Sequence, residues 1–218
     1  MITVGEAREA VLAAMPALET ETVPVAAACG RVLHQRVLAE RDQPPFDRVM
    51  MDGIAIRFAE FDEGQRTFPI QSRQHAGDPA QTLEAGRCIE IMTGASLPAG
   101  SDCIVPVERI TVRDGEAEIE AGYGAAARQH VHGRGSDHTE GTQLLRPGTR
   151  IAPADVAIIA SAGLTEVEVS RLPVIRVIST GNELVPAGAP IEPHQVRLSN
   201  GPAVIALLQQ HGYQACQH

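Results

Sequence analysis

The pattern of apolar and polar positions first predicts a helix at the start of the chain. Thr3 and Glu6 have the spacing of a capping box, in which two side chains satisfy backbone N–H groups at a helix N-terminus. Apolar residues then recur at helical spacing as far as Leu18. Because Pro16 lacks the N–H group that a helix interior needs, we expect it to perturb or end the last turn.

From Gly53 to about Gly141 the pattern changes to that of short strands. Apolar and polar residues alternate in several runs that Gly, Pro and Asp separate, as half-buried strands do. The runs are residues 53–57, 68–70, 87–92, 103–107 and 109–112. This pattern predicts a small β-rich domain. After it, residues 151–160 predict a helix that stops at Gly163, and residues 165–169 predict a strand.

The end of the chain has the pattern of a βαβ unit. Residues 174–178 are mostly β-branched, which is typical of a buried parallel strand. Residues 200–212 predict a helix with Ser199 or Asn200 as N-cap, and residues 213–216 look like the start of another strand. So few elements cannot bury their own apolar faces. We therefore expect this last domain to be incomplete in the chain, or completed by strands from elsewhere.

Composition narrows the classes of partner. With 218 residues the chain can form one large domain or two to three small ones. Its formal charge of −9 argues against a general binder of nucleic acid or of anionic membranes. An anionic substrate would therefore need a local basic residue, backbone N–H groups or a divalent cation.

Cysteine usage and the N-terminal sequence indicate a cytoplasmic protein. The four cysteines are scattered without CxxC spacing, which favours reduced thiols over disulfides or a zinc site. The first residues lack the basic and apolar regions of a signal peptide. No apolar run reaches the length of a transmembrane helix, so we expect no membrane association.

Two loops are candidates for chemistry. In residues 44–53, consecutive prolines stiffen a segment that presents Asp47 and Asp52, either to a metal or phosphate or merely as caps of a turn. Residues 179–199 follow a predicted strand and are longer than the usual connection of about 2–6 residues. Because open α/β sheets bind ligands at the carboxyl ends of their strands, we favour a site there over a surface excursion.

Three histidines offer a weaker hypothesis. His130, His132 and His138 have a spacing that can bind a transition metal. Glycines flank them, so a flexible polar loop is the favoured interpretation.

Four segments, in order, resemble the signatures of one family. Residues 44–53 resemble PPFDNSAMDGYA, and residues 91–108 are similar to MTGAPxPxGADxVVxxE. Residues 134–149 resemble an RxxGED…G segment, and residues 179–200 look like STGDEL…DSN. Over nearly its whole length the chain thus resembles the molybdopterin molybdenumtransferases, the MoeA and gephyrin E-domain proteins.

The resemblance implies a multidomain α/β plus β fold. Residues 1–46 and 142–172 would form an elongated helical and extended domain for linkage and dimerisation, interrupted by an inserted β-rich domain of residues 47–141. Residues 173–218 would be the truncated start of a three-layer α/β pterin-binding domain of the MoaB/MogA type. In full-length family members that domain continues and a β-barrel domain follows, which agrees with the packing argument.

The resemblance also implies an enzyme of molybdenum cofactor biosynthesis. Such enzymes insert molybdate into adenylylated molybdopterin and release AMP, with Mg²⁺ as cofactor and molybdate as substrate. The family forms homodimers whose site lies between domains of two subunits. Further implied partners are the molybdopterin adenylyltransferase and the molybdoenzymes.

Site residues carry over from the matching segments. The acidic catalytic set is Asp52, Asp137 and Glu183, of which Asp52 and Glu183 would also bind Mg²⁺. Substrate would be bound by hydrogen-bond donors, by glycines that permit close backbone approach, and by one basic residue: Thr93, Ser179, Thr180, Asn200, Gly94, Gly181 and Arg134. Each has a structural alternative, namely a turn residue, a strand-end cap or a solvated charge.

The chain departs from the family pattern at three carboxylates. Ser136 stands where the family has Glu, and Asn182 and Leu198 stand where it has Asp. These losses weaken an expectation of full metal binding or turnover. Two alternatives therefore stay open: a truncated, non-catalytic paralogue or scaffold that retains the family's N-terminal domains, and an assembly partner whose missing half another chain supplies.

Overall fold

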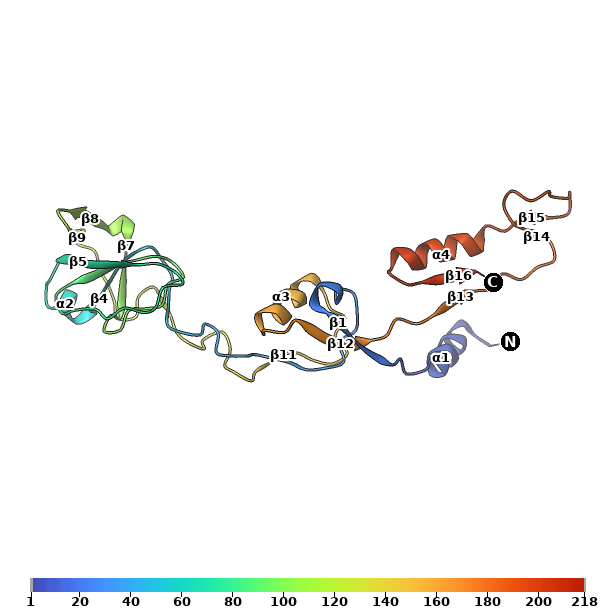
Figure 1. Ribbon diagram of the computed structural model, residues 1–218, viewed down its shortest axis with the longest axis horizontal. Helices are drawn as coiled ribbons and strands as arrows, with labels where there is room; N and C mark the ends of the chain where they lie inside the picture. The colour runs from blue at the N-terminus through green and yellow to red at the C-terminus, as the bar shows by residue number, and fades with distance from the viewer. Residues whose placement is uncertain (1, 218) are drawn as a thin grey trace. The chain divides into compact units, whose positions relative to one another are not determined.

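The computed structural model describes residues 2–217, and of residues 215–217 it describes the backbone alone. The chain divides into two compact units (Figure 1). The first unit contains the residues up to Arg36, Leu145–Ala160 and the residues from Leu164 onwards. The second unit contains Val37–Leu144 and Ser161–Gly163. The division into three domains at the boundaries given above stays a prediction.

The first unit begins with the helix that the capping box predicts. Helix α1 is Val4–Ala14. The Glu6 backbone N–H donates to Thr3 Oγ1 at 3.2 Å, and the Thr3 backbone N–H donates to Glu6 Oε2 at 2.7 Å. Met15 caps the other end, directly before Pro16. Both predicted ends are therefore confirmed.

The core of the first unit lies around an antiparallel strand pair. Strands β1 (Thr20–Pro24) and β12 (Glu166–Ser170) pair along their whole length. Along the chain, the helical turn η1 (Val25–Ala27) directly follows β1, and helix α3 (Pro153–Ser161) precedes β12. The large buried aliphatic residues in this part of the chain are Leu33, Ile151, Ile159, Val167 and Val169.

The predicted βαβ unit is confirmed. Strands β13 (Ile175–Val177) and β16 (Ala215–Gln217) pair in parallel, and helix α4 (Asn200–Gln210) connects them. The loop between β13 and α4 contains a second small parallel pair, β14 (Leu184–Val185) with β15 (Val196–Arg197). That the sheet is incomplete stays a prediction.

The second unit is built on one mixed sheet of six strands in the order β7-β4-β6-β5-β9-β8. The five strand runs that the alternation predicts are all present. They are β4 (Gly53–Ile56), β5 (Thr67–Gln74), β6 (Cys88–Ile91), β7 (Cys103–Pro106) and β8 (Ile110–Arg113). Within this sheet, β5 and β6 pair in parallel and the other neighbouring strands pair antiparallel. Helix α2 (Phe58–Asp62) and the helical turn η2 (Val107–Arg109) complete the unit.

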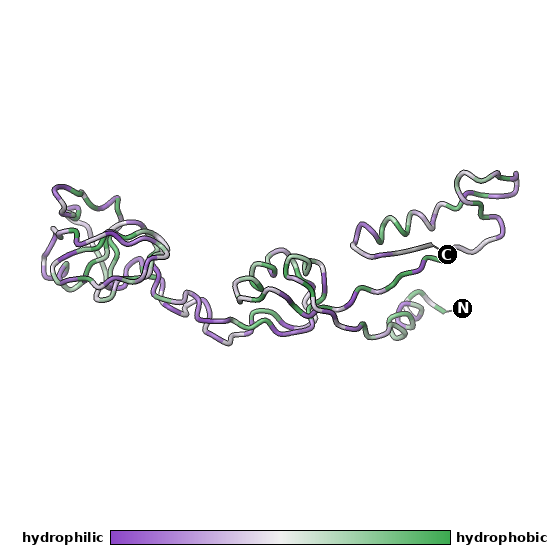
Figure 2. Tube along the Cα trace, viewed as in Figure 1, coloured by the Kyte–Doolittle hydropathy of each residue, from purple (hydrophilic) through white to green (hydrophobic). Residues whose placement is uncertain are grey.

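The core of this sheet combines aliphatic residues with two of the four phenylalanines of the chain. Its largest cluster contains Ile54, Ile56, Phe61, Phe68, Cys88, Cys103, Val105, Ala117 and Ile119. Figure 2 shows hydrophobic residues gathered in the strands of this sheet. Strand β9 (Glu116–Ile119) was not predicted, because only its two buried residues, Ala117 and Ile119, carry the pattern and Ala117 is weakly apolar.

Short paired strands lead into and out of the six-stranded sheet. Strand β2 (Val37–Leu38) pairs with β11 (Gln143–Leu145), and β3 (Arg48–Val49) pairs with β10 (Val131–His132). The latter pair is antiparallel, with Val131 opposite Val49. The chain therefore enters and leaves the sheet along one narrow ladder.

Cys29 is an exposed free thiol, and Cys88 and Cys103 are buried free thiols. The side chain of Cys216 lies outside the described residues. In the described part of the chain, no helix has both the length and the apolar character needed to cross a membrane.

Candidate functional site

The stiff loop before β4 presents Asp52 to a turn that follows β6. The Thr93 backbone N–H and the Thr93 hydroxyl donate to the same oxygen, Asp52 Oδ1, at 2.7 and 2.8 Å. Neither of these bonds uses the second carboxylate oxygen, Oδ2. These two hydrogen bonds, the backbone one first, lower the pKa of Asp52. Asp52 is thus an ionised carboxylate in a fixed orientation.

Gly94 shapes the turn that brings Thr93 to Asp52. Its φ of +86° lies in the left-handed region, which side chains disfavour. The Gly94 N–H donates to the Val49 carbonyl at 2.9 Å, and the Ala95 N–H closes the turn on the Met92 carbonyl at 3.1 Å. The structure therefore brings together three of the predicted site residues, Asp52, Thr93 and Gly94.

Asp137 and Arg134 lie in the same unit, in a network of charged side chains. Asp137 Oδ1 is 3.0 Å from His132 Nε2, and His132 Nδ1 is 3.2 Å from an Arg48 guanidinium nitrogen. The Arg134 guanidinium donates to Asp42 Oδ2 at 2.7 Å. The positive charge of Arg134 is thus already partnered inside the protein.

Asp47 joins the same network. Its carboxylate accepts hydrogen bonds from the Arg128 guanidinium and, at 2.9 Å, from the Arg134 backbone N–H. The bond from Arg128 is the main cause that lowers the pKa of Asp47. The Glu140 backbone N–H is the main cause that lowers the pKa of Asp42. Asp42 and Arg128 escaped the sequence reasoning because their partners lie more than 80 residues away in the chain.

Among the described residues, no group of three or more His, Cys, Asp or Glu side chains is placed to hold a metal ion. His132 instead contacts Arg48 and Asp137, and His130 lies 3.3 Å from the Gln129 side-chain amide. The hypothesis of a three-histidine site therefore receives no support.

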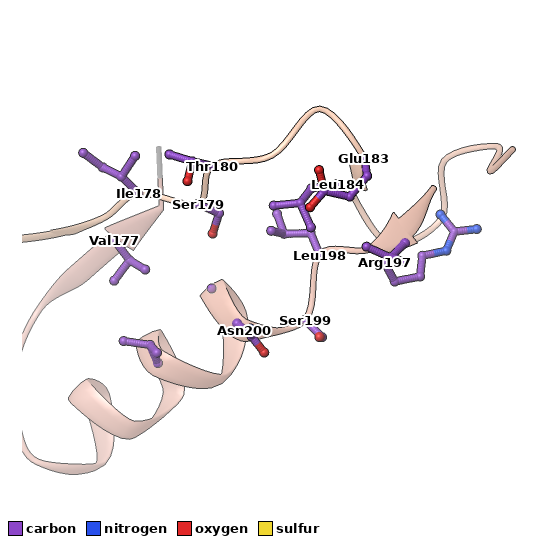
Figure 3. Close-up of a pocket in the computed structure, with 13 residues that line it drawn as sticks. Val177, Ile178, Ser179, Thr180, Glu183, Leu184, Arg197, Leu198, Ser199 and Asn200 are labelled. Carbon is purple, nitrogen blue, oxygen red and sulfur yellow. The ribbon is translucent and has the colours of Figure 1, made fainter. Parts of the chain in front are cut away.

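The first unit contains an open pocket of about 590 Å³ at the carboxyl end of β13 (Figure 3). Ser179 and Thr180 leave the strand on one side, and Ser199 and Asn200 open helix α4 on the other. The pocket therefore unites four of the predicted residues: Ser179, Thr180, Glu183 and Asn200.

Gly181 makes room for the carboxylate of Glu183. A Cβ atom at Gly181 would lie 2.6 Å from Glu183 Oε1, and the φ of Gly181 is +146°. Glu183 itself is anchored through its backbone, since the Val196 N–H donates to its carbonyl at 2.8 Å. A side chain at position 181 would collide with the Glu183 carboxylate, so the loop needs glycine there.

The start of α4 gives the pocket a positive pole. The first N–H groups of an α-helix lack intrahelical acceptors and bind anions. Ser199 makes no side-chain capping bond, and Pro202 has no N–H group, so the N–H groups of Asn200 and Gly201 remain directed to this end. Gly201 is buried and lines the pocket without a side chain to cover its N–H.

Nine of the pocket residues were not predicted as site residues, and Arg197 and Leu198 are two of them. Arg197 donates to the carbonyls of Pro186 and Ala189 at 2.9 and 2.7 Å and so braces the loop. Leu198, one of the departures from the family pattern, also lines the pocket. An apolar side chain therefore stands where the pattern has a carboxylate.

Comparisons with known proteins all lead to one family. The family model described as "MoeA N-terminal region (domain I and II)" matches residues 2–163. The molybdopterin molybdenumtransferase of Synechocystis sp. is 36% identical over 215 residues, which is 98% of this chain and 55% of that protein. The enzyme of that name from Bacillus subtilis is 32% identical, over 86% of this chain and 45% of that protein.

A solved structure shares the arrangement as well. The molybdopterin biosynthesis MoeA protein from Pyrococcus horikoshii OT3 matches with a TM-score of 0.82 at 27% identity, covering 97% of this chain and 58% of that chain. The chain spans about half the length of the curated relatives it matches.

Proposed function

The chain belongs to the MoeA family, and from this premise we propose that it acts in molybdenum cofactor biosynthesis as a molybdopterin molybdenumtransferase. The curated relatives that it matches carry that name. In the proposed reaction, adenylylated molybdopterin and molybdate are the substrates, molybdenum is transferred to the dithiolene, and AMP is released. The pocket at the carboxyl end of β13 is the observation that supports this most.

That pocket suits an oxyanion. The hydroxyls of Ser179 and Thr180 can donate hydrogen bonds, and the N-terminus of α4 adds backbone donors and the positive end of the helix dipole. A protein with a formal charge of −9 needs such a local device to hold phosphate or molybdate. We assign Ser179, Thr180 and Asn200 to substrate binding, with Gly181 permitting the fold of the loop.

We assign Asp52, Asp137 and Glu183 as the acidic residues of the reaction. Asp52 is the best supported, because Thr93 fixes its orientation and keeps it ionised. Thr93 and Gly94 form the turn that does so. We assign Arg134 to substrate binding as well, since its side chain stays exposed while it pairs with Asp42.

The chemistry of two carboxylates suits Mg²⁺. Magnesium prefers carboxylate and phosphate oxygens, and Asp52 keeps Oδ2 clear of both Thr93 bonds while Glu183 presents its carboxylate in the pocket. On the resemblance to the family, we propose each of Asp52 and Glu183 as a ligand of the ion. When bound, it would offset the charge of the pyrophosphate and polarise phosphorus.

Further elements of the proposal follow from the family. We expect a cytoplasmic homodimer that receives its substrate from the molybdopterin adenylyltransferase and passes its product to molybdoenzymes.

Release of AMP tests the function. The 218-residue chain is incubated with adenylylated molybdopterin, molybdate and Mg²⁺, and AMP is quantified. We expect molybdate-dependent AMP release that Glu183→Gln lowers by about 100-fold or more. Glu192→Gln is the matched control, because Glu192 is an exposed carboxylate of the same loop that does not line the pocket.

A second candidate function is binding without turnover, which Leu198 in the pocket favours. Binding of adenylylated molybdopterin without AMP release would support it. Absence of both binding and AMP release would contradict both functions.

A further inference from the structure

Gln74, the last residue of β5, is a fully buried polar side chain. Glutamine is mostly exposed in proteins, and a buried amide is tolerated when its donors and acceptor are hydrogen-bonded. No motif singled out this residue, and it belongs to none of the segments that resemble the family signatures. The contacts of its amide are therefore informative.

The Gln74 amide joins two separate segments. Its Nε2 donates to the Ser96 carbonyl at 2.6 Å and lies 3.2 Å from Ser96 Oγ. Its Oε1 accepts from the Gln81 backbone N–H at 2.8 Å. The amide thus has a donor contact on one side and an acceptor contact on the other, both inside the protein.

Ser96 belongs to the turn of residues 92–97, which carries Thr93. The same turn also contacts the segment before β4: the Gly94 N–H donates to the Val49 carbonyl at 2.9 Å, and the Leu97 N–H donates to the Asp47 carbonyl at 2.8 Å. The Thr93 N–H donates to Asp52 from the same turn. The turn is therefore held between the loop that carries Asp52 and the buried amide of Gln74.

We propose that Gln74 is a positioning residue of the candidate site, which holds the turn of residues 92–97 so that Thr93 meets Asp52. An apolar side chain at this position leaves the part-buried Ser96 carbonyl and Gln81 N–H without this partner, which is costly. Displacement of the turn towards solvent relieves that cost and withdraws Thr93 from Asp52. The consequence for catalysis rests on the function proposed above, whereas the contact itself does not.

Amide hydrogen exchange on the full chain tests the assignment. The variant is Gln74→Met, which fills a similar volume without an amide. Gln71→Met is the matched control, because Gln71 lies in the same strand and joins the Thr82 carbonyl to the Glu84 N–H at 2.9 and 2.8 Å, away from the turn. Both variants lose one bridging glutamine, but only one of them loses contact with the turn.

In Gln74→Met we expect exchange at the Thr93, Gly94 and Leu97 amides to accelerate by about tenfold or more, while the β8–β9 amides keep their protection. In Gln71→Met these three amides should exchange as in the unmodified chain. Uniform acceleration over the whole sheet, or no change at the three amides, would overturn the proposal, because Gln74 would then serve overall stability alone.

Gln74→Asn provides the same test if the Met variant does not fold, since its shorter side chain cannot reach Ser96 and Gln81 together. If neither folds while Gln71→Met does, the role of Gln74 is in the fold as a whole and the assignment is wrong. The exchange is measured without substrate. Failure of AMP release would therefore contradict the proposed function without affecting the assignment of Gln74. Unchanged exchange in Gln74→Met would contradict the assignment of Gln74 without affecting the proposed function.

Discussion

At the scale of single residues, Asp52 and Thr93 act as one group. Two donors from one residue converge on a single carboxylate oxygen. Thr93 is thereby the residue that sets both the orientation and the charge of Asp52. A substitution at position 93 can therefore remove the hydrogen bond of the hydroxyl and keep that of the backbone N–H.

Thr93→Val removes the hydroxyl and keeps the backbone N–H. We expect the pKa of Asp52 to rise towards its ordinary value, yet to stay below it, because the backbone bond is the larger cause of the lowering. Carboxyl-carbon chemical shifts followed through a pH titration measure this. Thr93→Ser keeps a hydroxyl and should leave the titration unchanged. An unchanged pKa in Thr93→Val would mean that the hydroxyl does not contact Asp52 in solution.

Acid should weaken the second unit. The pKa values of Asp42, Asp47 and Asp52 are all lowered in the folded state, so their contribution to stability is present above their ordinary pKa and is lost as pH falls through the lowered one. We expect the free energy of unfolding, measured with urea, to fall between about pH 5 and pH 2.

Asp47→Asn should flatten that pH dependence, because it removes the carboxylate that Arg128 holds ionised. Asp62→Asn, at the end of α2, removes a carboxylate outside this network and should leave the slope as it is. Equal slopes in the unmodified chain and in Asp47→Asn would contradict the prediction.

Sequence reasoning at this scale identified residues but not their partners. Asp52 and Thr93 were both candidates, and their pairing across 41 residues was not foreseen. Arg128 takes a left-handed backbone conformation with φ +65°, which no rule for a non-glycine residue predicts. Long-range pairing depends on tertiary structure, so a single sequence does not contain it in readable form.

At the scale of elements, prediction succeeded where the apolar period was strong or a cap was explicit. The capping box of α1 and the βαβ order of β13, α4 and β16 are examples. Strand ends shifted by a residue or more, as in β12, because hydrogen bonding in the ladder sets the ends rather than side-chain pattern. The parallel pairing of β5 with β6 was beyond the pattern, since alternation does not encode strand direction.

The pairing of β4 with β7 depends on Gly53. A Cβ atom there would lie 2.0 Å from the Val105 carbonyl oxygen. We expect Gly53→Ala to destabilise the second unit by about 3 kcal/mol or more, because the strands must separate to admit the methyl group. Urea unfolding measures the loss. Gly124→Ala, where a Cβ atom meets nothing within 4 Å, is the control and should be nearly neutral.

At the scale of the whole molecule, the buried thiols of the second unit report its unfolding. Burial raises the pKa of the Cys88 thiol to about 12 and that of Cys103 to about 11, whereas Cys29 is exposed. In a Cys216→Ser background, we expect Cys29 to react with a disulfide reagent under native conditions. Cys88 and Cys103 should react only as the second unit unfolds.

Combining that assay with Gly53→Ala tests whether this substitution opens the second unit. The variant should accelerate labelling of Cys88 and Cys103 and leave the labelling of Cys29 unchanged. Unchanged labelling of Cys88 and Cys103 in Gly53→Ala would contradict the prediction.

Family and function at this scale came from ordered motifs, not from composition. The charge excluded classes of partner, and the four segments indicated the family that the comparisons then showed. The pocket beside α4 was predictable because open α/β sheets bind ligands at the carboxyl ends of their strands. That Leu198 lines this pocket is known only from the structure.

The ladder that leads into and out of the six-stranded sheet has an evolutionary consequence. Because Val49 faces Val131 across β3 and β10, everything between them forms a closed cassette whose two ends are neighbours. Such a cassette can grow, shrink or be exchanged for another without stretching the chain on either side. Thr93 and Asp52, which are hydrogen-bonded to each other, both lie within this segment. A single recombination event that exchanged the segment would therefore transfer both residues together.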